Sequence, residues 1–204
     1  MQNAVPVAER VAGRTLASRQ EAYTDEVRRL VDAGYAVLRR SGGLEPRVGD
    51  VVREAGLSNQ AFYRHFRGKD ELLLAILDDG QRQLVGYLEH RLARVDPGAA
   101  QVRAWVEGVL EQARNRGAAD NTRPFALGSA RLADRFPEEM ARSRESVVAP
   151  LRAAVTAAGG HPTRDTEAVY QLTMGTMNDA LVRKVTPSKA DVAHVVEFAL
   201  AGMR

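Results

Sequence analysis

The stretch from Val48 to Leu73, VGDVVREAGLSNQAFYRHFRGKDELL, constrains the fold more than any other part of the chain. Its first eight residues place three valines and an alanine on one helical face. Gly56 then gives the backbone freedom that a tight interhelical turn needs, because glycine reaches positive φ without a Cβ clash. Ser58 can accept a free backbone amide at the start of a second helix. The pattern predicts two short helices, Arg47 to Glu54 and Ser58 to Arg67, joined by that turn.

The second of these helices has one apolar face and one polar face. Phe62 and Phe66, four residues apart, would pack inward together. A short exposed helix with amides at its N-terminus and hydroxyl and basic groups behind them suits the major groove of DNA. The alternative is an ordinary helical hairpin whose polar face is simply solvated. The residues left to face outward are Asn59, Gln60, Tyr63 and Arg64.

The run YRHF, followed by a lysine and then by an acidic helix start, is longer and more specific than a helix-turn-helix pattern alone. It closely resembles the N-terminal DNA-binding domain of TetR-type transcriptional regulators over about residues 21–77. The rest of the chain is similar to that family only in length and helical character. The residues that match the family pattern are Ala55, Gly56, Leu57, Ser58, Tyr63, His65, Phe66, Lys69 and Leu72.

This resemblance implies a set of DNA contacts. It places Tyr63, His65 and Lys69 at phosphates, where their hydrogen-bonding or cationic groups fit. Asn59 and Gln60 are the best candidates for base contacts, because an amide can bond bidentately to adenine. The sequence departs from the family pattern at positions 47, 52, 60 and 61, so the operator sequence does not follow from the resemblance. The full predicted set is Arg47, Ser58, Asn59, Gln60, Ala61, Tyr63, Arg64, His65 and Lys69.

The charge distribution favours the same partner. The net charge of +3 is too small to indicate nucleic acid by itself. Between Arg39 and Lys69, however, seven basic residues stand against three acidic ones. A local basic excess beside a helix-turn-helix is typical of phosphate contact. We therefore expect double-stranded operator DNA as a partner.

The remaining sequence predicts helices throughout and no strands, so the expected fold class is all-α. Residues 1–18 lack an apolar period and predict a flexible arm, with a basic arm in the minor groove as the alternative. Residues 19–78 are the expected DNA-binding domain, with the turn motif at 47–66, and residues 79–204 the expected regulatory domain. About nine helices are expected; those outside the turn motif span residues 19–40, 70–95, 99–116, 122–136, 137–158, 163–184 and 188–202.

Composition and motifs exclude several classes of protein. No apolar run approaches the roughly 20 residues that cross a bilayer, and the first residues do not resemble a signal peptide, so a cytoplasmic protein without a membrane partner is expected. The four histidines have no HExxH or HxxxH spacing. Neither a GxxxxGK loop nor a GxSxG elbow occurs. We expect no metal, no cofactor and no catalytic residue, which leaves an enzyme on a helical bundle as a remote alternative.

The resemblance further implies two features of the regulatory part. One is a homodimer, in which the last two helices pair with their two-fold mates, through Val169, Leu172, Thr176, Val192, Val195, Val196 and Ala199. The other is a pocket for a small-molecule effector of unknown identity, expected to be apolar. For every residue in both sets the alternative is plain intramolecular core. The candidate pocket residues are Leu84, Tyr87, Leu88, Trp105, Phe125, Phe136, Met140, Met174 and Met177.

The function that these expectations describe is sequence-specific transcriptional regulation. The first hypothesis is a repressor that a small ligand releases from its operator. The alternative is an activator, or a regulator of the same fold that responds to a protein partner. Two-fold symmetry fits either, because a single helix-turn-helix makes too few contacts for tight specific binding.

Overall fold

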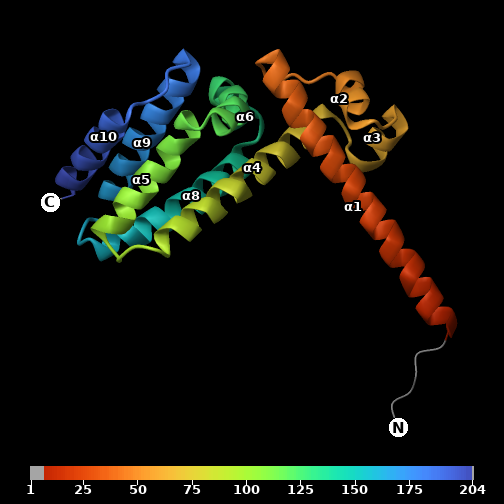
Figure 1. Cartoon of the computed structure of the whole chain (residues 1–204), viewed down its shortest axis with the longest axis horizontal. Coiled ribbons are helices and arrows are strands. Elements are labelled where there is room, and N and C mark those ends of the chain that lie inside the picture. Colours follow the sequence, from red (N-terminus) through yellow and green to blue (C-terminus); the bar gives the residue numbers. More distant parts are fainter. Residues whose placement is uncertain (1–6, 204) are drawn as a thin grey trace, which may run out of the picture.

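The computed structural model describes residues 7–203, with side chains from residue 17 onward except that of residue 129. This part of the chain is helical and contains no strand, so the predicted all-α class is confirmed (Figure 1). The helices are α1 Val7–Ser41, α2 Val48–Ala55, α3 Asn59–His65, α4 Lys69–Leu92, α5 Ala99–Arg114, α6 Arg116–Leu127, α7 Ser129–Arg135, α8 Pro137–Ala157, α9 Arg164–Arg183 and α10 Lys189–Gly202. Among the described residues, no helix combines the length and the apolar character that a bilayer crossing requires.

The N-terminal helix is longer than the sequence predicted. A flexible arm was expected up to residue 18, but α1 is continuous from Val7 (Figure 1). Residues 7–18 contain three alanines, two arginines and one glutamate, which favour helix by their intrinsic propensity. The prediction was wrong because it required an apolar period. Residues 1–6 of the predicted arm lie outside the described part of the chain.

The described chain contains ten helices rather than nine, and the difference lies between α5 and α8. Asn115 ends α5 and caps α6, since its side-chain oxygen accepts the Ala118 N–H at 3.1 Å. The helix expected to open at Thr122 therefore begins six residues earlier, and Pro124 lies inside it. Gly128 separates α6 from α7, at a point where an added Cβ would overlap the side chain of Leu44.

Two hydrophobic cores organise these helices. The N-terminal core is formed by α1 to α4 together with Leu132 of α7, which is 3% exposed. The C-terminal core is formed by the second half of α4 and by α5, α6, α8, α9 and α10. Trp105 is fully buried at its centre, and its indole N–H donates to the Val147 carbonyl at 3.1 Å. Figure 1 shows α4 running from one group of helices to the other.

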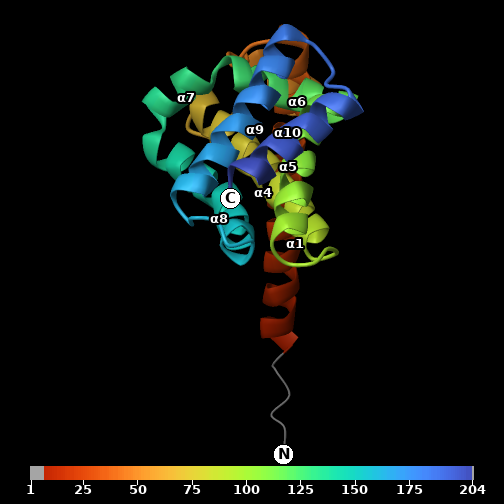
Figure 2. The ribbon, with the colours of Figure 1, turned by 90° about the vertical axis from the view of Figure 1, so that its left-hand side faces the viewer.

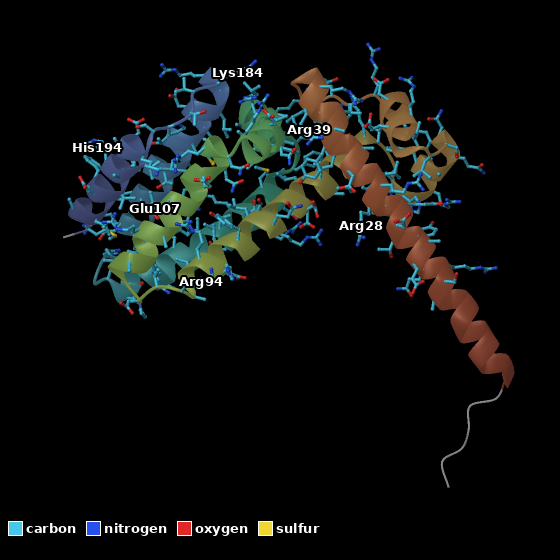
Figure 3. All side chains as sticks on the ribbon, in the orientation of Figure 1. Arg28, Arg39, Arg94, Glu107, Lys184 and His194 are labelled. Carbon is cyan, nitrogen blue, oxygen red and sulfur yellow. The ribbon has the colours of Figure 1, made fainter. Side chains whose placement is uncertain are left out.

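The joint between the two cores lies where α1, α4, α6 and α7 meet. Gly34 of α1 lies so close to Ile76 of α4 that an added Cβ would overlap that side chain. The Tyr35 hydroxyl donates to the Ile76 carbonyl at 2.9 Å. Arg39, labelled in Figure 3 near the end of α1, donates to the side-chain oxygen of Asn121 in α6 at 3.2 Å.

Helix α7 adds ion pairs to the same joint. Arg131 pairs with Glu45 in the loop before α2 at 2.5 Å, and Arg135 pairs with Asp70 in the first turn of α4. Figure 2 shows α7 at the edge of the molecule, between α6 and α8 in the chain. These contacts connect the N-terminal core to the rest through α4, α6 and α7.

We predict that Leu132→Ala destabilises the protein through the N-terminal core. Removing a buried leucine side chain leaves a cavity and costs about 2–5 kcal/mol of unfolding free energy. Leu127, at the end of α6, is 52% exposed, so Leu127→Ala serves as the matched control and should change stability little. Denaturant unfolding of both variants provides the measurement. Equal stability losses in the two variants would show that α7 is not part of the N-terminal core.

Candidate nucleic-acid interface and effector cavity

The turn between α2 and α3 has the geometry that the sequence predicted. Gly56 ends α2 at φ 63° and ψ 37°, which is the left-handed region. The Leu57 N–H then donates to the Val52 carbonyl at 2.9 Å, a bond typical of a glycine-terminated helix. Ser58 caps α3, accepting the Ala61 N–H at 3.1 Å. Gly56 and Ser58 therefore define the local geometry of the turn.

Arg29 of α1 supports this turn and was missed at the sequence level. Its guanidinium donates to the Ala55 carbonyl at 2.6 Å and to the Gly56 carbonyl at 3.2 Å. These are C-terminal carbonyls of α2, where a positive charge complements the helix dipole. The distance of 26 residues along the chain explains why no local pattern pointed to this contact.

The exposed face of α3 carries three of the nine side chains predicted to contact DNA. Asn59 and Gln60 are exposed, and Tyr63 is 61% exposed. Phe62 is fully buried in the N-terminal core beneath them. Ala61 is also buried, at 7% exposure, so its predicted place among the contact residues is wrong: it lies on the core side of the helix.

His65 is the second residue of the predicted DNA set that does not lie on the exposed face. Its side chain is only 1% exposed, and its Nε2 lies 2.6 Å from the Glu26 carboxylate of α1. The Tyr23 ring packs edge-on against the imidazole, with the ring centroids 4.2 Å apart. His65 therefore connects α3 to α1 instead of contacting a phosphate.

Arg64 shares the same acidic partner. Its guanidinium pairs with Glu26, while the Tyr23 hydroxyl donates to the Arg64 carbonyl at 3.4 Å. The hydrogen bonds from His65 and Arg64 hold the pKa of Glu26 below its usual range. Arg64 stays about half exposed, so it lies at the edge of the candidate interface.

Two further cations of the predicted set lie at the ends of neighbouring helices. Arg47 is exposed just before α2 and makes no side-chain capping bond. Lys69, at the start of α4, is 40% exposed, and its Nζ lies 3.3 Å from the Glu45 carboxylate. Arg131 and Lys69, in that order of effect, lower the pKa of Glu45. The candidate interface thus joins exposed amides, one tyrosine and several cations.

A cavity of about 480 Å³ lies between the two cores, at the middle of α4. Its size falls in the range of sites for small molecules. Three predicted residues are not among those that line it: Leu88 and Trp105 are fully buried in the C-terminal core, and Phe136 packs against the N-terminal core. The predicted residues that do line it are Leu84, Tyr87, Phe125, Met140, Met174 and Met177.

The cavity is more polar than the predicted apolar pocket. Tyr35 contributes from α1, and burial raises the pKa of its hydroxyl. Arg144 stacks on the ring of Tyr170 at 4.7 Å, on the side formed by α8 and α9. Arg144 was missed because the pocket residues were chosen for their apolar character. Other polar lining residues that the sequence-based prediction missed are Gln81, Gln83, Gln112, Asn121, Thr122, Ser143 and Asn178.

Most residues predicted to form the dimer interface are buried inside a single chain. Leu172 and Thr176 are half-buried on α9. Their outer face stays accessible, as do the apolar side chains of Val182, at 46% exposure, and Phe198, at 63% exposure. Helices α9 and α10 lie far from α2 and α3, with His194 labelled on α10 in Figure 3. The predicted residues with exposures of 8% or less are Val169, Val192, Val195, Val196 and Ala199.

Comparison with known proteins agrees with this geometry. Residues 30–76 match the model of the family of bacterial regulatory proteins described as the tetR family. A protein of Haemophilus influenzae, described as an uncharacterized HTH-type transcriptional regulator, is 28% identical over 124 residues, which cover 56% of this chain and 60% of that protein. The match thus spans less than two thirds of the relative.

Solved structures extend the similarity to the whole fold. A TetR transcription regulator from Haloarcula marismortui superposes with a TM-score of 0.73 at 19% identity, covering 88% of this chain and 97% of that one. A TetR-family regulator from Mesorhizobium loti gives 0.67 at 17% identity, covering 89% and 96%. The fold and the turn define a helix-turn-helix protein. The matched segment is similar to the TetR family, which agrees with the resemblance found in the sequence.

We predict that Glu26→Gln weakens binding to every duplex by a similar factor, because it removes the charge that holds His65 and Arg64 against α1 without changing an exposed side chain of α3. Glu21→Gln, an exposed position on the same helix, is the matched control. Titrations of labelled duplexes of different sequence provide the measurement. A change in base preference, with affinity for the best site retained, would contradict this role.

The same substitution should alter the dependence of stability on pH. Because the pKa of Glu26 is lowered in the folded protein, its stabilisation is complete above the ordinary value of 4.5 and is lost as the pH falls through the folded value. The wild type should therefore be more stable than Glu26→Gln at neutral pH, and the two should converge in acid. If the difference in stability between the two proteins stayed constant from neutral to acid pH, the lowered pKa of Glu26 would be refuted.

Proposed function

We propose that this protein is a homodimeric, sequence-specific transcriptional regulator that represses by binding operator DNA and is released by a small ligand. Residues 19–78 would form the DNA-binding domain and residues 79–204 the regulatory domain, in the cytoplasm. The observation that carries the proposal is the exposed face of α3, held by a left-handed glycine turn within the segment that matches the TetR family.

The DNA-binding part of the proposal rests on the chemistry of that face. Asn59 and Gln60, at the N-terminus of α3, present amides that can bond bidentately to adenine in the major groove. Tyr63 on the same helix, and Arg47 and Lys69 at the starts of α2 and α4, carry accessible groups suited to phosphates. Two copies related by a two-fold axis would place two such helices in successive major grooves, about 34 Å apart.

The dimer part rests on the outer face of α9 and α10. Phe198 and Val182 expose large apolar surface at positions where a monomer would gain nothing from it. This face lies at the opposite end of the molecule from α3 (Figure 1), so pairing through it leaves both recognition helices free. The proposed seam therefore differs from the buried valines that the sequence indicated.

Ligand release rests on the position of the cavity. Leu77, Gln81 and Leu84 of α4 line it, while the first turns of α4 belong to the N-terminal core. A ligand that fits one tilt of α4 better than another shifts the population between them, typically with about 1–3 kcal/mol of coupling. A change of tilt moves the two recognition helices relative to each other.

The direct test is a binding titration of the purified full-length protein with duplexes from upstream of its own gene and with scrambled controls. Saturable binding to one duplex, at a stoichiometry of two chains, is the expected result. Binding that is equal for all duplexes at every salt concentration would contradict sequence-specific regulation.

Lys69→Ala and Gln60→Ala should affect DNA binding in different ways. Loss of a phosphate contact lowers the affinity for all duplexes alike. It also reduces the steepness of log affinity against log salt concentration by about one unit for each lysine lost. Loss of a bidentate base contact costs about 1–3 kcal/mol at one position in each half-site and relaxes the preference there. Affinity measured over a salt series and a set of single-base variants separates the two. An unchanged salt slope in Lys69→Ala would exclude it as a phosphate contact.

Phe198→Glu should convert the dimer to a folded monomer, because a charge at the proposed seam would be buried without a partner. Leu127→Glu makes the same type of change at an exposed residue of α6 and serves as the control. Sedimentation or light scattering gives the mass, and circular dichroism shows whether the fold is retained. A Phe198→Glu protein that keeps the dimer mass would place the interface elsewhere.

A further inference from the structure

The charge of the cavity distinguishes it from a plain apolar pocket. Arg144 is the one side chain with a full charge among the described residues that line it, and no carboxylate lines it. A cationic ligand would therefore meet no counter-charge within the walls, whereas an anion would meet a guanidinium. A neutral ligand would offer the guanidinium no opposite charge.

The Arg144 guanidinium is held in a fixed orientation. It lies over the Tyr170 ring at 4.7 Å, and Tyr170 in turn packs against Trp105, with ring centroids 6.4 Å apart. Trp105 is anchored by its bond to the Val147 carbonyl. A guanidinium stacked on an aromatic ring loses little further freedom when it binds a carboxylate, because its planar donors are already oriented.

Glu167 does not satisfy the whole guanidinium. Of the five N–H groups, the structure describes one hydrogen bond, from Nη2 to a single Glu167 oxygen. The other Glu167 oxygen accepts the Gln171 amide at 2.7 Å, so this acid keeps a partner if Arg144 turns to a ligand. The Arg144 side chain is 40% exposed and that of Glu167 is 47% exposed, so the pair is accessible to solvent.

Apolar and adaptable side chains form another part of the lining, the methionine wall. It consists of Leu84, Phe125 and three methionines, and methionine side chains adjust to irregular ligands. Asn121 and Asn178 add amides to the lining. The cavity therefore combines one anion-binding end with an apolar body, which is the pattern of an amphipathic molecule.

We propose that the effector is an amphipathic monoanion, a carboxylic acid on an apolar body, whose carboxylate binds Arg144 beside Tyr170 while its body lies against the methionine wall. This inference rests on the proposed ligand control and specifies its chemistry. It replaces the purely apolar ligand that the sequence indicated. Arg144 is then the residue that selects acids over their neutral analogues.

The test uses matched probes and calorimetry on the full-length protein at neutral pH. The probes are decanoate with decanol, 2-naphthoate with 2-naphthalenemethanol, and decylamine as the cation. Each acid should bind about tenfold or more tightly than its alcohol, as a charge-assisted hydrogen bond to a partly exposed arginine allows. Decylamine should bind more weakly than both decyl probes.

Variants then assign the preference to one residue. Arg144→Gln should abolish the preference for the acids while leaving the alcohols within about twofold, a result that a misfolded cavity would not give. Arg144→Lys, which keeps the charge, covers the case in which Arg144→Gln does not fold. Glu167→Gln should strengthen acid binding, because it removes the competing carboxylate. Arg142→Gln, at a neighbouring position of α8 outside the cavity lining, is the matched control.

The outcomes separate this inference from the proposed function. Equal binding of acid and alcohol, preference for decylamine, retention of the acid preference in Arg144→Gln, or no binding by any probe would each overturn it. Measuring operator affinity with and without each bound probe tests ligand control separately. Acids that bind through Arg144 but leave operator affinity unchanged would support the ligand class and refute control by release. If neutral probes release the operator while acids do not, control by release would be supported and the proposed ligand class would be refuted.

Discussion

Helix α4 belongs to both hydrophobic cores, and the arrangement of the whole molecule depends on this sharing. Leu72, Leu73 and Ile76 are buried in the N-terminal core, whereas Leu88 and Leu92 are buried in the C-terminal core. Between them the helix lines the cavity. An α-helix transmits a tilt along its length because its backbone bonds are internal. Neither core can therefore change its relation to the other without moving the helix that forms the cavity wall.

Helix α3 depends in turn on α1. It has seven residues, well below the length at which an isolated helix is stable in water, so its position comes from tertiary contacts. Phe62 anchors it from within the core, and Tyr23 and Glu26 hold its C-terminal end from outside. Arg29 holds the turn before it. Three successive helical turns of α1 thus orient the face that we propose meets DNA.

The features that the sequence predicted correctly are those determined by neighbouring residues. The positive φ of Gly56 and the cap at Ser58 follow from the chemistry of one or two positions. The existence and class of the helices follow from their apolar periods. The extension of α1 did not, because residues with high helix propensity can form a helix without an apolar period in the sequence.

The site residues were predicted less well, because apolar or polar character does not say which neighbour a side chain meets. His65 matched the family pattern, yet its partner Glu26 lies 39 residues away and turns it from the surface. Trp105 and Val196 are fully buried in the chain's own core, although their residue types fit a pocket wall or a subunit seam equally well. Arg144 enters the cavity from α8, and only the packing of α8 against α9 places it beside Tyr170.

The ion pairs at the joint between the cores are consistent with the change of shape that we propose for ligand release. Lys69 and Arg131 share Glu45, and both cations and the acid are about half exposed. Exposed pairs of this kind contribute little, about 0–1 kcal/mol each, so one can be exchanged at small cost. If Lys69 moves to a DNA phosphate, Glu45 still has Arg131 and is not left unpaired. The joint can then rearrange within the few kcal/mol that a ligand or an operator supplies, while Leu132 keeps α7 packed against the N-terminal core.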